Sequence, residues 1–168
     1  MAERPIVLYG DPVLREVSKE VVDFNQDIKD LVSDLTDTLK KARGLGLAAV
    51  QIGVCKRLFI VDLSAVDLKE SLKVFVNPEI LESSGEVEME EGCLSFPGIY
   101  QKIVRPAKIR VRAFNLDGKQ FELSLDGIAA RAVLHEYDHL EGKLFIDYIS
   151  PFARSMLKSK LKKLATVS

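Results

Sequence analysis

The residues with the most specific chemistry lie in one pentapeptide, His135-Glu136-Tyr137-Asp138-His139, which contains both histidines of the chain. Its pattern is H-E-x-x-H. On a helix, positions i and i+4 project from the same face, so both imidazoles can reach one metal ion. Glu136 adjoins His135 and is well placed to act on a metal-bound water. The pentapeptide therefore predicts a metal site, although so short a pattern also occurs by chance in surface helices.

The segment around these histidines is expected to form a buried helix. Asp126 is a suitable N-cap residue, Gly127 opens the helix, and Gly142 is well placed to end it. A helix that is apolar on nearly all sides is typically buried, and the apolar residues here are Ile128, Ala132, Val133, Leu134, Tyr137 and Leu140. Two histidines and a glutamate in such a helix need partners, and a metal ion would supply one.

A tetrahedral catalytic site needs a third protein ligand and an open position for water. The chain has no further histidine, and Phe145 occupies the position of the third one in the longer pattern H-E-x-x-H-x-x-G-x-x-H. Glu141, the last glutamate, follows His139 by two residues and points to another side of a helix. The two cysteines, Cys55 and Cys93, remain as candidates.

Cys93 is the better candidate for the third ligand. It follows Gly92, which permits a close backbone approach, and it precedes a Pro97-Gly98 turn signal that is typical of a shaped loop or strand end. Cys55 lies beside two cations at the start of a predicted strand. We expect Cys55 to be a small, buried or partly buried thiol without a metal.

Length and composition favour one globular domain over residues 1–168. The chain is 47% hydrophobic and 29% charged, which is ordinary for a soluble protein. The net charge of -1 argues against a DNA-binding protein. Two widely spaced cysteines form no disulfide framework, and a thiolate ligand favours a reducing compartment. The first residues lack signal-peptide character and no apolar run approaches about 20 residues, so we expect a cytoplasmic protein without a membrane span.

Periodicity predicts two further helices and a set of strands. An amphipathic helix is expected from 25 to about 42, a C-terminal helix over about 151–165, and a short turn after Asp11-Pro12. The expected strands are 57–63, 73–76 ended by Asn77-Pro78, a hairpin over 80–89, then 100–104, 108–115 and 120–125, the last two joined at Asp117-Gly118. The prediction is an α+β fold, with antiparallel or mixed strands packed around a buried central metal-binding helix.

A glycine-rich stretch, Gly44-Leu45-Gly46-Leu47-Ala48-Ala49-Val50-Gln51, separates the first helix from the strands. It matches neither a phosphate-binding loop nor a dinucleotide fingerprint, because the required lysine and glycine spacings are missing. Gln51 is the lone polar side chain in this stretch. From that context alone, we expect Gln51 to lie on the surface.

Three stretches together resemble the signature motifs of peptide deformylases: G-L-G-L-A-A-V-Q at 44–51, E-G-C-L-S at 91–95 and H-E-Y-D-H at 135–139. The match extends from 11–15 to the C-terminal helix. The family removes the N-formyl group from the initiator formylmethionine of nascent bacterial chains and releases formate. The resemblance implies Fe(II) as the native metal, replaceable by zinc, nickel or cobalt, with Cys93, His135 and His139 as ligands and water in the fourth position.

The resemblance also implies roles for residues around the metal. Glu136 would act as general base and then general acid while water activated by the metal attacks the formyl carbon. The Gln51 side-chain amide and the Leu94 backbone N–H would stabilise the oxyanion, which places Gln51 in the site and not on the surface. An apolar pocket and a strand-like backbone grip for the substrate are implied at Leu45, Gly46, Met89, Gly92, Tyr100, Ile128 and Ala132.

Three other features have two interpretations each. We expect Arg131 to face solvent or to lie at the rim of the pocket. Glu91 and Arg105 form either a pair that fixes Cys93 or two unrelated surface charges. The lysine-rich C-terminal helix resembles the tail that many bacterial deformylases dock on the ribosome, but a packed amphipathic helix with a solvated basic side has the same pattern.

Two other functions would use the same residues. H-E-x-x-H also serves metalloproteases, which hydrolyse internal peptide bonds. A structural metal domain would need four protein ligands, and Cys55 is the spare residue that could complete such a set.

Overall fold

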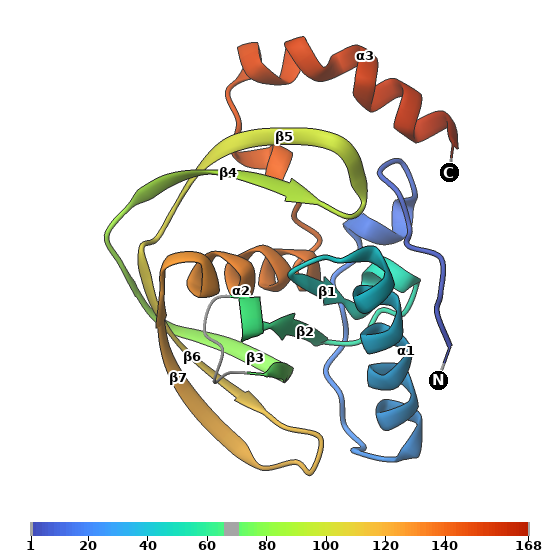
Figure 1. Ribbon diagram of the computed structural model, residues 1–168, viewed down its shortest axis with the longest axis vertical. Helices are drawn as coiled ribbons and strands as arrows, with labels where there is room; N and C mark the ends of the chain where they lie inside the picture. Colours follow the sequence, from blue (N-terminus) through green and yellow to red (C-terminus); the bar gives the residue numbers. More distant parts are fainter. Residues whose placement is uncertain (1, 66–70, 168) are drawn as a thin grey trace.

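A computed structural model describes residues 2–65 and 71–167 of the chain (Figure 1). Within these residues, three α-helices and two antiparallel sheets form the predicted α+β fold. The helices are α1 (Gln26–Ala42), α2 (Gly127–Leu140) and α3 (Pro151–Val167). Short 3-10 helices, η1 to η4, lie at Pro12–Arg15, Ala49–Ile52, Leu63–Ala65 and Phe145–Tyr148.

The strands divide into two separate sheets. One has five strands in the order β1-β2-β3-β6-β7, and the other consists of β4 and β5 alone. Neighbouring strands pair antiparallel throughout. The strands are β1 (Gly46–Ala48), β2 (Leu58–Asp62), β3 (Leu72–Ser84), β4 (Val87–Cys93), β5 (Phe96–Arg105), β6 (Lys108–Phe114) and β7 (Gln120–Asp126).

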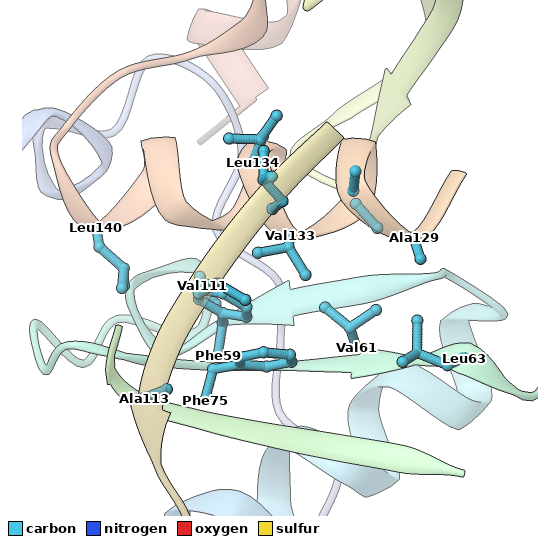
Figure 2. Close-up of a cluster of buried hydrophobic side chains, with 14 of the residues drawn as sticks. Phe59, Val61, Leu63, Phe75, Val111, Ala113, Ala129, Val133, Leu134 and Leu140 are labelled. Atoms are coloured by element: carbon cyan, nitrogen blue, oxygen red, sulfur yellow. The ribbon is translucent and has the colours of Figure 1, made fainter. Parts of the chain in front are cut away.

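Helix α2 lies between the two sheets, with the β4–β5 ribbon on one side and the five-stranded sheet on the other (Figure 1). Its apolar side chains, among them Ala129, Val133 and Leu140, face the five-stranded sheet (Figure 2). Phe59 and Phe75 stack against each other beneath the helix, with ring centroids 5.0 Å apart. Burial of this face fixes the position and rotation of α2, and therefore of its two histidines.

Local capping supports the predicted start of α1 and the predicted end of α2, but not the predicted cap at the start of α2. Asn25 caps α1, because its side chain accepts a hydrogen bond from Ile28 N–H at 3.3 Å. Asp126 precedes α2, but its side chain makes no capping bond. Gly142, with φ +72°, follows the end of α2 as expected. Helix α3 spans the predicted range, and among its described residues Leu157 and Leu161 are buried.

Two strand predictions were wrong. Strand β3 does not end at Asn77-Pro78 but continues to Ser84. The strand pairing has a register shift at this point, where Asn77 takes φ +49°. The predicted 80–89 hairpin does not form, since β3 pairs with β2 and β6 while β4 pairs with β5. A local alternation of apolar and polar residues shows that a strand exists but not which strand is its partner. No helix among the described residues is long and apolar enough to span a bilayer.

Candidate metal centre

The three predicted metal ligands come together from two elements. Cys93 ends strand β4, and His135 and His139 share one face of α2. One ligand atom from each lies within 4.8 Å of the other two, and Cys93 Sγ is 3.4 Å from His139 Nε2. Among the described residues, no other cysteine and no carboxylate joins this group as a fourth ligand. Cys55 is elsewhere and partly buried, with its Sγ 3.5 Å from Glu16 Oε2, as expected for a thiol without a metal.

The donor set fits a divalent ion. His135 Nδ1 lies 2.9 Å from Glu91 Oε1, so this nitrogen carries the proton and Nε2 is left as the ligand atom. Burial lowers the pKa of His139 well below its ordinary value, which keeps the ring neutral and able to bind a metal. Burial opposes protonation of His135, but Cys93 and Glu91 outweigh it and raise the pKa of this ring well above its ordinary value, so a bound metal ion takes the place of a proton there. One thiolate with two imidazoles suits zinc, iron, cobalt or nickel better than calcium or magnesium.

The carboxylate of Glu91 is buried next to the metal ligands, where it contacts His135 and Arg105. It pairs with Arg105, whose Nη2 donates to Oε1 at 2.9 Å, so the predicted pair is present. Its direct contact with the site is His135, whereas the pairing was expected to act on Cys93. Burial would raise the pKa of Glu91, but hydrogen bonds from His135 and Arg105 outweigh it and hold the pKa at about 2. Arg105 also donates to Asp138 at 2.8 Å.

Arg131 does not face solvent, which was one of its two expected positions, but it does line the pocket beside the metal ligands. Its side chain is only 6% exposed and donates to Glu91 Oε2, to the Ile103 carbonyl at 3.0 Å and to the Val87 carbonyl at 2.7 Å. A buried arginine is stable only when acceptors surround it. Those acceptors come from β4 and β5, and nothing in the sequence of α2 reveals them.

Gln51 is buried at the site. Its local sequence context had suggested a position on the surface, and that expectation was wrong. Its side chain is 1% exposed, and Ala48 N–H donates to its Oε1 at 3.0 Å. The amide Nε2 donates to Ser95 Oγ at 3.1 Å and lies 3.6 Å from Cys93 Sγ. These contacts fix the direction of the amide. Ser95 was missed by sequence reasoning, although it is the last residue of the E-G-C-L-S stretch and is fully buried.

Glu136 lies beside the ligands in a nearly closed environment. Burial raises its pKa to about 7, and its Oε1 is buried without a hydrogen-bond partner among the described residues. Gly46 provides the space for this carboxylate, because a Cβ at Gly46 would lie 3.0 Å from Glu136 Oε2. A carboxylate with a free oxygen next to a metal site can accept a proton from a bound water.

A cavity of about 580 Å³ opens beside the metal ligands. Cys93, His135 and Glu136 line it, and Arg131 lies in its wall. Tyr100, 61% exposed, stands at its rim, and its ring occupies the space that a side chain at residue 92 would need. All the residues that the resemblance implies for substrate and oxyanion contact line the same cavity, namely Leu45, Gly46, Gln51, Met89, Gly92, Leu94, Tyr100, Ile128 and Ala132.

A catalytic metal site differs from a structural one in leaving a coordination position for water. Three protein donors converge here next to a buried carboxylate and an accessible cavity. The fold and the site therefore define a metal-dependent hydrolase, and the structural alternative with Cys55 as a fourth ligand is wrong because Cys55 lies outside the group.

Comparison with known proteins identifies which hydrolase this is. The family model described as polypeptide deformylase matches residues 3–155. The chain is 44% identical over 165 residues to peptide deformylase 2 of Nitrosomonas europaea, which covers 98% of this chain and 88% of that protein. It is 46% identical over 164 residues to the peptide deformylase of Cellvibrio japonicus, covering 97% and 96%.

The fold agrees with the same assignment. A crystal structure of a peptide deformylase from Legionella pneumophila matches with a TM-score of 0.91 at 46% identity, covering 99% of this chain and 97% of that one. The peptide deformylase of Thermus thermophilus matches with a TM-score of 0.91 at 39% identity, covering 98% and 99%. The chain belongs to the polypeptide deformylase family, and its activity is that of a peptide deformylase, as the three motifs indicate.

Proposed function

We propose that this deformylase acts in the cytoplasm on nascent chains that begin with formylmethionine, with Fe(II) as its native metal. The observation that carries the proposal is the convergence of Cys93, His135 and His139 beside the cavity. When bound, the ion supplies Lewis acidity and a water of lowered pKa. A thiolate ligand and a nascent-chain substrate both favour a reducing cytoplasm.

Glu136 moves the proton in this proposal. Its carboxylate accepts a proton from the attacking water and then delivers it to the nitrogen of the leaving amine. The unpartnered Oε1 and the raised pKa support a group that exists in both protonation states near neutral pH. Release of formate and a free amino terminus completes the reaction.

Gln51 and Leu94 stabilise the charge that develops on the formyl oxygen. The Gln51 amide is held in one orientation by Ala48 and Ser95, so it loses little freedom when the oxyanion forms. Leu94 follows the ligand Cys93 directly and is one of the residues that line the cavity. Donors that are fixed before the reaction stabilise a transition state more than donors that must reorient.

The substrate main chain lies between two free sheet edges. Strand β1, with Gly46, is at the edge of the five-stranded sheet, and β4, with Gly92, has a partner only in β5. An extended peptide can therefore bond to backbone groups of both strands, including Leu45, as an added strand. The first side chain enters the apolar part of the cavity formed by Met89, Ile128 and Ala132. Tyr100 at the rim contacts the residues that follow.

The test is formate release measured together with metal content. Enzyme prepared without oxygen should contain one Fe(II), should release formate from a formyl-Met peptide, and should leave unblocked peptides and internal peptide bonds intact. Activity of the iron form should fall in air, while cobalt- or nickel-loaded enzyme should retain it. Cleavage of internal bonds would favour the metalloprotease alternative, and an iron form that is stable in air would contradict iron as the native metal.

We also propose that α3 contacts ribosomal RNA through its exposed lysines, Lys158, Lys160, Lys162 and Lys163. Deleting the helix would uncover the core, because Leu157 and Leu161 pack into it. Replacing the four lysines by glutamine avoids this problem. The variant should co-sediment less with ribosomes, with a smaller salt dependence. Unchanged co-sedimentation at every salt concentration would leave α3 as a packed helix with a solvated face.

A further inference from the structure

The metal ligands belong to two parts of the fold that share no strand pairing. The histidines lie on α2, which packs on the five-stranded sheet, whereas Cys93 lies on the β4–β5 ribbon, which forms its own sheet. The buried apolar cluster around α2 includes no residue of β4 or β5. The apolar residues of the ribbon pack instead with η4 and α3, through Phe96, Ile99, Ile103, Phe145 and Leu157. Neither cluster contains apolar residues of both the ribbon and α2, although Phe145 of the second cluster packs near His135, with ring centroids 6.0 Å apart.

Polar side chains connect the β4–β5 ribbon to α2 at both ends of the histidine motif. Near its end, Arg105 of β5 donates to Asp138, and Tyr148 donates to the same carboxylate at 2.8 Å. One helical turn before His135, Arg131 reaches from α2 to Glu91 and Val87 on β4 and to Ile103 on β5. Arg131 is therefore bound to both strands of the ribbon at once.

Within the set of Glu91, Asp138, Arg105 and Arg131, the charges are balanced only when Arg131 is present. Glu91 and Asp138 contribute two negative charges, and Arg105 and Arg131 two positive ones. Glu91 has no acceptor capacity to spare, since His135 and two guanidinium groups donate to it. A planar guanidinium can serve three acceptors in fixed directions, which an ammonium group cannot do as well.

We propose that Arg131 is a positioning residue, which fixes the β4–β5 ribbon against α2 and thereby sets the separation of Cys93 from the two histidines. Arg131 also lies in the wall of the cavity, so the same contacts set the width of the pocket for the first side chain of the substrate. This role in substrate selection rests on the function proposed above, whereas the role at the metal does not.

The test compares Arg131→Met and Arg131→Lys with the wild-type enzyme. Methionine keeps an unbranched apolar stem without the charge or the hydrogen-bond donors, and lysine keeps the charge without the planar guanidinium group. Arg110→Met is the matched control, because Arg110 forms two ion pairs with Glu82 and Glu122 on the exposed face of the five-stranded sheet. For each protein we would measure Co(II) affinity against a competing chelator, the thiolate-to-Co(II) absorption band, Tm, and kcat and KM.

Arg131→Met should bind Co(II) about 10–100-fold more weakly, the usual effect of losing a group that supports a metal ligand. Its thiolate-to-Co(II) band should shift, because the sulfur has moved relative to the imidazoles. KM for formyl-Met peptides should rise more than kcat falls at saturating metal, and the preference for formyl-Met over formyl-Ala should narrow. Arg131→Lys should lie between this variant and the wild type, and Arg110→Met should match the wild type.

A merely structural role would give a different pattern. If Tm falls while Co(II) affinity and the absorption band stay within twofold of wild type, or if Arg110→Met shows the same changes, the proposal is overturned. Should Arg131→Met fail to fold, Arg131→Lys alone decides by the same two metal measurements. Absence of formate release by the wild type would sink the proposed function but not the metal positioning, which the Co(II) measurements test independently.

Discussion

At the scale of single residues, Glu136 has the surroundings of a proton carrier. It is buried beside the metal ligands, and its Oε1 has no hydrogen-bond partner among the described residues. An acid with a structural role would instead be saturated with donors, as Glu91 is. The two carboxylates lie on neighbouring elements, yet Glu91 accepts several hydrogen bonds while Oε1 of Glu136 accepts none from the described residues.

The first prediction concerns Glu136→Gln. The amide has nearly the shape of the acid but cannot accept and return a proton, so kcat for formate release should fall by about 10²–10⁴. Metal content should remain that of wild type, since Glu136 is not among the converging ligands. Kinetics and metal analysis on the same sample check both parts. Loss of the metal in step with the activity would show that Glu136 supports the ion itself.

The second prediction concerns Glu91→Gln. An amide cannot accept from His135 and both guanidinium groups, and it leaves Arg105 and Arg131 without their shared counter-charge. Metal affinity should fall about 10–100-fold. Dialysis against a chelator, followed by metal analysis, measures this loss. A variant that kept wild-type affinity would remove Glu91 from any role at the metal.

Sequence reasoning located the ligands at this scale because histidine and cysteine are scarce in the chain. It could not place Arg131 or Gln51 from their own neighbourhoods. Both side chains are stabilised by groups on other elements, namely the β4 and β5 carbonyls for Arg131 and Ser95 for Gln51. Only the likeness to a known motif indicated the position of Gln51.

At the scale of elements, the helices and the β6–β7 hairpin at Asp117-Gly118 were predictable, but the partners of β3 and β4 were not. The periodicity of α1 and α2 reflects burial of one face and needs no knowledge of the partner. The turn residues before Val87 correctly end one strand and begin another, but here the chain passes from one sheet to the other. Because the chain passes from one sheet to the other, the metal site and the cavity lie between the two sheets.

The third prediction concerns the link between η1 and η4. Arg15 donates two hydrogen bonds to Asp147, at 2.7 and 3.0 Å. Burial opposes ionisation of Asp147, but the bond from Arg15 outweighs it and lowers the pKa of Asp147. A carboxyl whose pKa is lower in the folded state stabilises the fold above its unfolded pKa of about 3.9, and this contribution is lost as pH falls through the folded value.

Arg15→Gln should therefore lower the free energy of unfolding by less than about 1 kcal/mol at pH 7, a modest figure because the Arg15 side chain is 44% exposed. The difference from wild type should shrink as pH falls through the lowered pKa of Asp147, because the carboxyl then loses its charge in both proteins. Urea unfolding at pH 7 and at a pH where Asp147 is protonated measures it. An equal difference at both would mean that packing, and not charge, carries the contribution of Arg15.

At the scale of the whole molecule, the two sheets hold α2 between them and bring distant segments to one point. Cys93 belongs to strand β4 of the ribbon, the two histidines belong to helix α2, and Gln51 belongs to η2, which follows β1. The C-terminal end of α3 returns to the N-terminal region, where a Cβ at Gly10 would lie 2.5 Å from Ala165 Cα. The motifs along the chain predicted which residues meet, but they did not predict that Cys93 lies on a separate two-stranded sheet.

The most direct test of the metal site is X-ray absorption spectroscopy of the enzyme loaded with Fe(II) without oxygen. We predict one sulfur and two imidazole nitrogens around the ion, with the sulfur at about 2.3 Å, the distance known for zinc thiolates. The sulfur signal should vanish in Cys93→Ala and persist in Cys55→Ala. A spectrum without sulfur in the wild type, or loss of sulfur in Cys55→Ala, would contradict the account.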